Sequence, residues 1–204
     1  MSTDHRIYLA SRSPRRRELL TQIGVRFDML LFRTPPREDN AVDESCLPDE
    51  MPSEYVQRVA RAKAEHGAGL IRERRLPRRP LLAADTTLDL DGEIIGKPRD
   101  ALDAENILAR LSARTHRVLS AVAVNVDGRI ETALAASDVR FRAISAQEIR
   151  HYVQSGEPMD KAGAYAIQGR AAMFVAEIHG SYSGIVGLPL CETALLLQKF
   201  GFEF

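Results

Sequence analysis

Tryptophan is absent from the 204 residues, and cysteine and histidine are scarce, with two and five residues. Cys46 and Cys191 lie far apart and in no spacing typical of a metal site, which suits a reducing compartment and argues against a cysteine nucleophile. The histidines are equally scattered. The sequence therefore offers nothing from which to build a zinc site, and any bound metal would be a hard cation held by carboxylates.

Long apolar runs and a net charge are missing too. No apolar run approaches the length of a membrane span, and residues 1–6 lack the core of a signal peptide, so we expect a cytoplasmic protein with no membrane partner. Lysine plus arginine number 28, and aspartate plus glutamate also number 28, so no overall electrostatic field would hold the protein on nucleic acid. Any attraction for phosphate must be local.

Two arginine-rich stretches still leave a nucleic-acid-binding module as a rival interpretation, namely residues 12–17 and 72–79. The zero net charge disfavours this rival, and no aromatic residues interleave with the second stretch to stack bases. We therefore expect no nucleic-acid partner and interpret residues 72–79 as surface charge.

The composition that remains is that of an ordinary globular protein, with 45% hydrophobic and 27% charged residues. The length suits a single domain with a sizeable core, or two lobes around a cleft. Expected strands alternate with helices in the first half of the chain and pair later as hairpins, beginning with a turn at Asp91-Gly92. This order favours the α/β class with a mixed sheet. Ser145 and Glu148 have the spacing of a capping box that opens a later helix.

A strand-to-helix junction near the start of the chain predicts a phosphate site. Residues 7–10 form a short apolar run, Ser13 is a good N-cap, and Pro14 then occupies the first helical position, where its missing N–H costs nothing. The free N–H groups and positive dipole end of such a helix attract an anion, and Ser11 can add a hydroxyl donor.

Three arginines follow at the start of this helix. Helical spacing places Arg15 above Leu19 and Arg16 above Leu20, on the apolar stripe, whereas Arg17 points away from it. A basic triplet is more often solvated surface charge, and we keep that interpretation for Arg17. Because Arg15 and Arg16 extend the stripe to the mouth of the strand, we expect both to face the phosphate.

A second strand is expected over residues 25–32, followed by a long polar loop over residues 33–52 that is rich in proline and acid. Such a run is typical of a solvated connection, and we expect most of its acids to be solvated. Ser53 is then the expected cap of the next helix.

Lys63 occupies an unusual place on that helix. It continues the apolar stripe of Val56, Val59 and Ala60, at a position where a lysine is unexpected. Two interpretations carry similar weight, since the side chain could snorkel to the rim or extend its ammonium into a cleft. Arg58 falls on the outer face of the helix and is interpreted as solvated charge.

An apolar run at residues 80–84 predicts a buried strand that ends at Asp85, and α/β proteins place chemistry at such strand ends. If the predicted hairpin closes a regular ladder, Thr86 faces Lys97, and Lys97 returns to the neighbourhood of Asp85. A structural ion pair is one interpretation of this proximity, and a catalytic pair is the other.

Residues 157–169 are dense in small residues and polar tips, a composition that indicates a pocket lining. Gly163 and Gly169 would let the backbone approach a ligand, and Gln168 offers an acceptor and donors to the edge of a flat heterocycle. Taken alone this is a weak signal, because a glutamine flanked by glycine is usually only part of a loop.

Together these stretches resemble the Maf family of nucleotide pyrophosphatases, and the resemblance covers almost the whole chain. It rests on the stretches Ser11–Leu20, Val42–Glu44, Arg61–Ala64, Ala84–Thr87, Gly96–Pro98, Asp160–Gly169 and Gly180–Leu190. It is closer to the branch that acts on dTTP and UTP than to the branch associated with 7-methyl-GTP. The resemblance implies an elongated, mixed and twisted α/β sheet with helices, similar to inosine triphosphate pyrophosphatases, with two lobes around a central cleft, and a homodimer.

The resemblance also implies residue roles. The catalytic set is Asp85, Lys97 and Glu44, of which Glu44 and Asp85 would hold Mg²⁺ or Mn²⁺. The substrate-binding set is Ser11, Arg15, Arg16, Lys63, Thr86, Asp160, Lys161 and Gln168. Three of these, Arg15, Thr86 and Gln168, would distinguish one base from another. The Gln168 amide can flip to match uracil or cytosine, so the choice of thymine and uracil comes from the resemblance.

A nucleoside triphosphate suits this inventory, because arginine gives bidentate contacts to phosphate and a divalent ion bridges phosphate oxygens. We expect hydrolysis at the α-phosphorus, which gives a nucleoside monophosphate and pyrophosphate. The main alternative is a nucleotide-sensing regulator of cell division and septum formation that binds nucleotide without turnover.

Overall fold

The computed structural model describes residues 6–32 and 42–204. Its strands are β1 (Ile7–Leu9), β2 (Phe27–Met29), β3 (Leu81–Leu90), β4 (Glu93–Ile95), β5 (Thr115–Val126), β6 (Arg129–Phe141) and β7 (Val175–His179). Its helices are α1 (Pro14–Gln22), α2 (Pro52–Glu73), α3 (Ala101–Leu111), α4 (Ala146–Gln154), α5 (Tyr182–Val186) and α6 (Leu190–Gln198), with 3₁₀ turns η1 (Glu157–Asp160), η2 (Ala162–Ala164) and η3 (Arg170–Phe174). None of the helices in these described ranges is long and apolar enough to cross a membrane.

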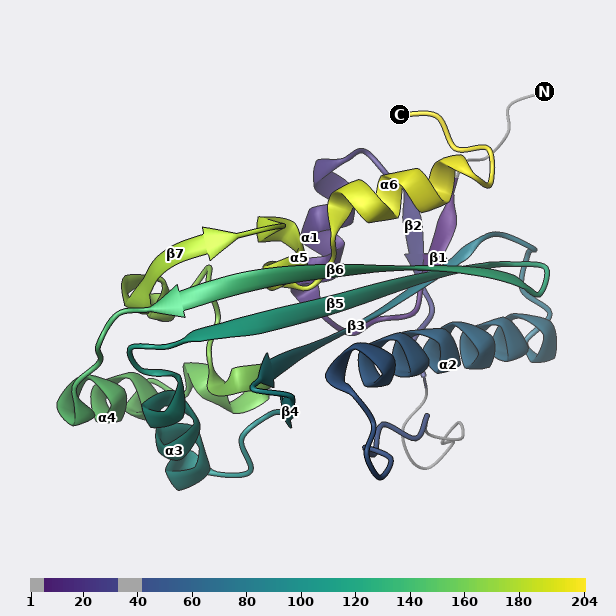
Figure 1. Cartoon of the computed structure of the whole chain (residues 1–204). Helices are drawn as coiled ribbons and strands as arrows, with labels where there is room; N and C mark the ends of the chain where they lie inside the picture. Colours follow the sequence, from purple (N-terminus) through teal and green to yellow (C-terminus); the bar gives the residue numbers. More distant parts are fainter. Residues whose placement is uncertain (1–5, 33–41) are drawn as a thin grey trace.

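The strands form one mixed sheet in the order β2-β1-β3-β5-β6-β7, with β4 paired to β3. β1 is parallel to β2 and β3, and the other pairings are antiparallel. Figure 1 shows the long strands β5 and β6 running through an elongated molecule, with α2 on one face and α1 and α6 on the other. The mixed α/β sheet expected from the alternation of elements is confirmed.

Three apolar clusters cover this sheet. One lies between α2 and the sheet and includes Val56, Ala60 and Leu119. A second lies on the opposite face, where α1 and α6 pack. The third gathers around α3 and α4 at the far end of the long strands, and Figure 1 shows both helices there. The core therefore falls into two parts along the sheet, and the long strands pass through both.

Local signals placed several elements correctly. α1 begins at Pro14, and the Ser145–Glu148 capping box opens α4. The Asp91-Gly92 turn joins β3 to β4 with both residues at positive φ, as a tight two-residue hairpin requires. Each of these signals depends on only a few neighbouring residues, and the tertiary packing of the protein is compatible with all of them.

Two boundaries differ from expectation. α2 begins at Pro52 with Met51 as its N-cap, so Ser53 already lies inside the helix. Asp85 lies in the middle of β3 and does not end it, because β5 pairs with β3 continuously from Leu81 to Asp89. The polar residues at 85–87 interrupt the apolar run, but backbone pairing with β5 carries the strand through them.

The pairing of β3 leaves one stretch of its edge open. On that side β1 pairs with Leu81 and Leu82, and β4 pairs with Leu88–Leu90. Between these partners, residues 83–87 have a neighbouring strand only on the β5 side within the described part of the chain. The open edge is about 16 Å long at the usual rise per strand residue. It lies where β1 leads into α1 and therefore positions the site described next.

Candidate active site

Lys63 lies between two of the predicted carboxylates. Its Nζ is 2.8 Å from Asp85 Oδ1 and 3.0 Å from Glu44 Oε1. The side chains of Lys63 and Asp85 are 14% and 11% exposed, and that of Glu44 is 52% exposed. Lys63 continues the stripe of Val56, Val59 and Ala60 on α2, as its spacing predicts, and its ammonium reaches Asp85 on the open edge of β3. The structure thus brings together three predicted site residues from three segments of the chain.

The same two carboxylates suit a hard divalent cation. Their oxygens converge on one ammonium, so they already share a position where positive charge is favourable. Within residues 6–32 and 42–204, no group of three or more histidine, cysteine, aspartate or glutamate residues could hold a metal ion. Asp85 and Glu44 would then supply two ligands, with water and phosphate oxygens completing the shell, as is usual for Mg²⁺.

Arg16 is held at the beginning of α1 by three acceptors. Its Nε donates to the carbonyl oxygen of Gly187 at 2.8 Å, Nη1 donates to Ser11 Oγ at 3.2 Å, and Nη2 donates to Thr86 Oγ1 at 3.4 Å. Burial lowers the pKa of Arg16, and the negative charges of Asp85 and Glu44 act in the opposite direction. Arginine still remains cationic at neutral pH. The guanidinium therefore belongs to the same electrostatic cluster as the two carboxylates.

Ser120 on β5 is a site neighbour that sequence reasoning missed. Its Oγ is 2.8 Å from Thr86 Oγ1 and donates to the carbonyl oxygen of Gly184 at 2.7 Å. Ser120 is fully buried and lies directly opposite Thr86 in the ladder of β3 and β5. A serine inside the apolar run of residues 118–124 was the available signal. The Ser120 hydroxyl therefore fixes the orientation of the Thr86 side chain.

The other two arginines of the triplet differ from Arg16. Arg17 is exposed, as expected. Arg15 has a side chain that is 42% exposed and forms an ion pair of 3.4 Å with Glu18 on its own helix. The start of α1 has no side-chain cap, because Ser13 precedes the helix but makes no cap hydrogen bond. The first N–H groups of α1 are thus free of a side-chain cap, which is the arrangement that attracts an anion.

The Asp85 carboxylate and the Arg16 guanidinium lie on opposite faces of β3. Alternation along the strand directs Asp85 to the face covered by α2, and directs Thr86 to the face where Arg16 lies. Between the two faces, residues 83–87 have no strand neighbour on the side of β1 and β4 in the described chain. The negative charges of Asp85 and Glu44 nevertheless act on Arg16 across the strand.

Lys97 does not enter the expected ladder. β4 ends at Ile95, opposite Leu88, so the predicted pairing of Thr86 with Lys97 is wrong. The chain turns away at Gly96, whose carbonyl oxygen accepts a hydrogen bond from Gly163 N at 3.0 Å. Lys97 is exposed at this point. The backbone bond brings the segment after β4 against η2, which is a different neighbour from the one expected.

Asp160 and Lys161 form a second polar group in the lobe of α3 and α4. Lys161 Nζ donates to the Glu157 carbonyl oxygen at 2.8 Å and is ion-paired with Asp160. The hydrogen bond from Lys161 lowers the pKa of Asp160, and the positive charge of Lys97 adds to this effect. Gln168 is exposed nearby in sequence. Three of the predicted residues, Asp160, Lys161 and Lys97, therefore lie near one another in this part of the structure.

Close packing fixes this segment onto the end of β3. Gly163 has φ of +71°, and a Cβ built on it would lie 2.2 Å from Leu88 Cδ2. The glycine at this position is required for both its conformation and its close approach to Leu88. Glu157 accepts from the Tyr152 hydroxyl at 3.0 Å and from Arg170 N at 3.1 Å. The residues between 157 and 170 are thereby tied to α4 and to the core.

A buried histidine supports the same segment. His116 Nε2 is 2.8 Å from the Tyr165 hydroxyl, and the two residues are 2% and 6% exposed. Both rings also contact Phe141 edge to face. Burial lowers the pKa of His116 to about 4, against only a weak opposing effect of Asp138. His116 is therefore neutral in the folded protein at pH 7.

We expect this histidine to make the fold less stable in acid. The folded-state pKa lies below the ordinary value of 6.5, so the unfolded state binds the proton more tightly. Stability from this group is complete at pH 7, falls as the pH drops below about 6.5, and levels off below about 4, with a total loss of about 3 kcal/mol. Urea unfolding of wild type and His116→Gln between pH 7 and 4 measures this loss of stability. Parallel pH profiles for the two proteins would contradict the assignment.

Comparisons with known proteins show the family of the chain. The family model described as Maf-like protein matches residues 6–200. A dTTP/UTP pyrophosphatase of Dechloromonas aromatica is 61% identical over 97% of this chain and 98% of its own length. One of Chromobacterium violaceum is 51% identical over 100% of this chain and 99% of its own. The structure of the Staphylococcus aureus Ham1 protein aligns with a TM-score of 0.48 and 13% identity, over 96% of this chain and 97% of that chain.

The fold and site define an α/β protein with a mixed sheet, in which two carboxylates, a lysine and a half-buried arginine lie at the unpaired edge of β3. The chain belongs to the Maf family.

Proposed function

We propose that the protein hydrolyses dTTP and UTP to the nucleoside monophosphate and pyrophosphate. The observation that carries the proposal is the convergence of Arg16, Lys63 and Asp85 at the open edge of β3. Cations beside a buried carboxylate are what cleavage of a phosphoanhydride needs, since charge must be neutralised on the phosphate oxygens while water is positioned. Relatives that match nearly the full chain are named dTTP/UTP pyrophosphatase, which supports this choice of substrates.

The start of α1 binds the phosphates. Its first N–H groups lack a side-chain cap, and they act together with the guanidinium of Arg16 and the hydroxyl of Ser11. Arg16 is pre-oriented by the Gly187 carbonyl, so little side-chain entropy is lost when phosphate binds. Lys63 neutralises negative charge on the phosphate oxygens from the face of β3 that α2 covers.

Asp85 orients the attacking water and accepts its proton. The water oxygen forms a bond to the α-phosphorus while the bond to the leaving pyrophosphate breaks, and the proton moves to the Asp85 carboxylate. Lys63 fixes the orientation of this carboxylate through the 2.8 Å bond to Oδ1. A Mg²⁺ or Mn²⁺ ion held by Glu44 and Asp85 would neutralise charge on the phosphate oxygens when bound.

The base lies toward the lobe of α3 and α4. Thr86, fixed by Ser120, and the exposed Gln168 are the groups that we assign to base recognition, together with Arg15. The Asp160–Lys161 pair and Lys97 lie on the same side of the open edge, where they would contact the rest of the nucleotide. The homodimer remains a prediction.

Pyrophosphate release from a panel of nucleotides tests the proposal. With Mg²⁺ or Mn²⁺ we expect turnover of dTTP, UTP and modified pyrimidine analogues, with slower release from dCTP, dATP and dGTP. Equal inactivity on the uracil and thymine nucleotides would contradict it. Tight binding of dTTP without any pyrophosphate would instead support the alternative of a nucleotide-sensing regulator of cell division.

A further inference from the structure

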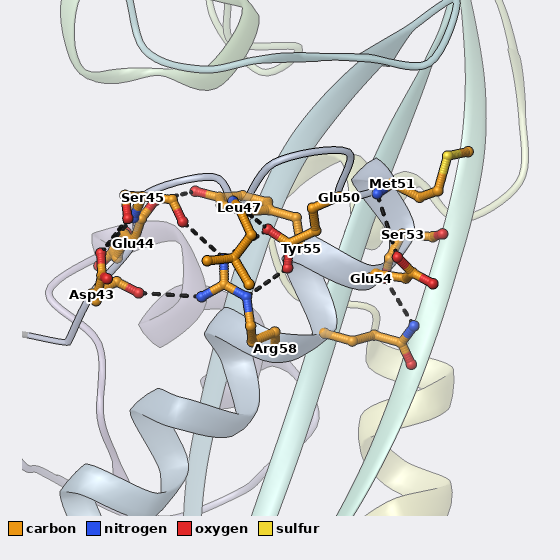
Figure 2. A network of polar contacts seen from close by, with 11 residues as sticks. Asp43, Glu44, Ser45, Leu47, Glu50, Met51, Ser53, Glu54, Tyr55 and Arg58 are labelled. Atoms are coloured by element: carbon orange, nitrogen blue, oxygen red, sulfur yellow. Dashed lines mark hydrogen bonds and ion pairs between the residues drawn. The ribbon is translucent and has the colours of Figure 1, made fainter.

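The segment that carries Glu44 is fixed to the first turns of α2 by Arg58. Figure 2 shows the guanidinium of Arg58 lying inside this segment, between Ser45 and Glu50. Nη2 donates to the Ser45 carbonyl oxygen at 2.8 Å, and Nη1 reaches the Asp43 carbonyl oxygen at 3.5 Å. Arg58 was interpreted as solvated charge, and that interpretation is wrong.

Glu50 fixes the direction of the guanidinium. Its two carboxylate oxygens lie 2.5 Å from Arg58 Nε and 2.8 Å from Nη2, a bidentate pair. The Glu50 side chain is only 7% exposed, although it comes from the loop in which most acids were expected to be solvated. The Glu50 bond raises the pKa of Arg58, and the reverse effect lowers the pKa of Glu50. The pair is charged and oriented before any ligand arrives.

Tyr55, one helical turn before Arg58, adds the third contact. Its hydroxyl donates to the Glu44 carbonyl oxygen at 3.0 Å, and its ring lies 5.6 Å from the Arg58 guanidinium carbon. Burial raises the pKa of Tyr55 to about 12, so the hydroxyl keeps its proton at neutral pH. Three consecutive carbonyl groups, of residues 43 to 45, are thus bound by two side chains of α2.

These contacts matter because they fix the backbone around Glu44 to α2, whereas the bond from Ser45 N to Asp43 Oδ1 at 2.9 Å lies within the segment itself. Residues 42–47 have neither helical nor strand structure, and the side chain of Glu44 is half exposed. Helix α2 contacts the segment twice, at its backbone through Tyr55 and Arg58 and at the Glu44 carboxylate through Lys63. The contacts of Tyr55 and Arg58 with the backbone determine where the Glu44 carboxylate can point.

We propose that Arg58 is a positioning residue that holds the Glu44 carboxylate at the divalent-ion site beside Asp85. The inference rests on the proposed role of Glu44 as an ion ligand. Arg58 bonds Glu50 and the carbonyl oxygens of Asp43 and Ser45, and in this proposal it acts by ordering the backbone of residues 43–45 in advance. Partners that orient metal ligands typically contribute 10- to 100-fold to metal affinity.

Binding of Mn²⁺ alone to the full-length protein, measured by the loss of the free-ion electron paramagnetic resonance signal, tests the proposal. Arg58→Gln is expected to weaken Mn²⁺ binding about 10- to 100-fold. Arg61→Gln is the matched control, because Arg61 forms an exposed ion pair with Glu65 on the same helix, and its affinity should equal that of wild type. Unchanged affinity in a folded Arg58→Gln variant would overturn the proposal.

A second set of variants separates this inference from the function on which it rests. Glu44→Gln should weaken Mn²⁺ binding by itself, and adding Arg58→Gln to it should cause little further loss. If Glu44→Gln binds Mn²⁺ normally, the ion-ligand role fails; if the two losses multiply in full, Arg58 acts elsewhere and only the present inference fails. If Arg58→Gln does not fold, the Mn²⁺ affinity of Tyr55→Phe tests the same ordering of the backbone around Glu44. This substitution removes one hydrogen bond to the Glu44 carbonyl, so a loss of about three- to tenfold supports the proposal and none overturns it.

Discussion

Replacing Asp85 by asparagine is expected to lower pyrophosphate release by about 10²- to 10⁴-fold. The amide has the same size and still accepts the hydrogen bond from Lys63, but it cannot take a proton from water. Lys63 keeps Glu44 as a second partner, so the fold should survive. The measurement is the rate of pyrophosphate release with saturating dTTP and Mg²⁺, alongside urea unfolding of the same preparation.

Asp138→Asn is the control for this variant. Asp138 lies on β6 in an exposed ion pair with Arg117, and such pairs contribute at most about 1 kcal/mol. Its turnover should match wild type. Turnover of Asp85→Asn within about threefold of wild type would remove Asp85 from the reaction and would require another proton acceptor.

The parts of the site that follow from local sequence were predictable. Pro14 marks the start of α1, and the spacing along α2 places Lys63 beside its apolar stripe. Both depend on helical periodicity and N-terminal preferences, which act within a few residues. The family resemblance then named Glu44 and Asp85, and the structure brings both to Lys63.

The missed features depend on contacts between distant segments. A helical wheel places Arg58 outside, because it considers only the helix, whereas the loop of residues 42–51 folds back over that face. Ser120 becomes informative only through its register with Thr86, and a single strand does not give the register. The predicted position of Lys97 assumed a regular ladder, but the bond from Gly163 to Gly96 diverts the chain.

Lys63→Met is expected to lower the free energy of unfolding by about 3 kcal/mol in a buffer containing a chelator. Methionine fills a similar volume but leaves two carboxylates facing each other, of which that of Asp85 is largely buried. Removing one partner of a buried ion pair leaves an uncompensated charge, and this cost exceeds the net contribution of the pair itself. Lys199→Met, which breaks an exposed pair with Glu131, should change stability by less than about 1 kcal/mol.

Divalent ions should restore much of this lost stability. Without the ammonium, the Asp85 and Glu44 carboxylates are both free to bind a cation, so added Mn²⁺ should stabilise Lys63→Met more than it stabilises wild type, in which lysine already lies between them. Urea unfolding with chelator and with Mn²⁺ measures the difference for both proteins. Equal stabilisation of the two would mean that the ion does not bind between these carboxylates, and Glu44 would lose its assigned role while Asp85 could still act on water.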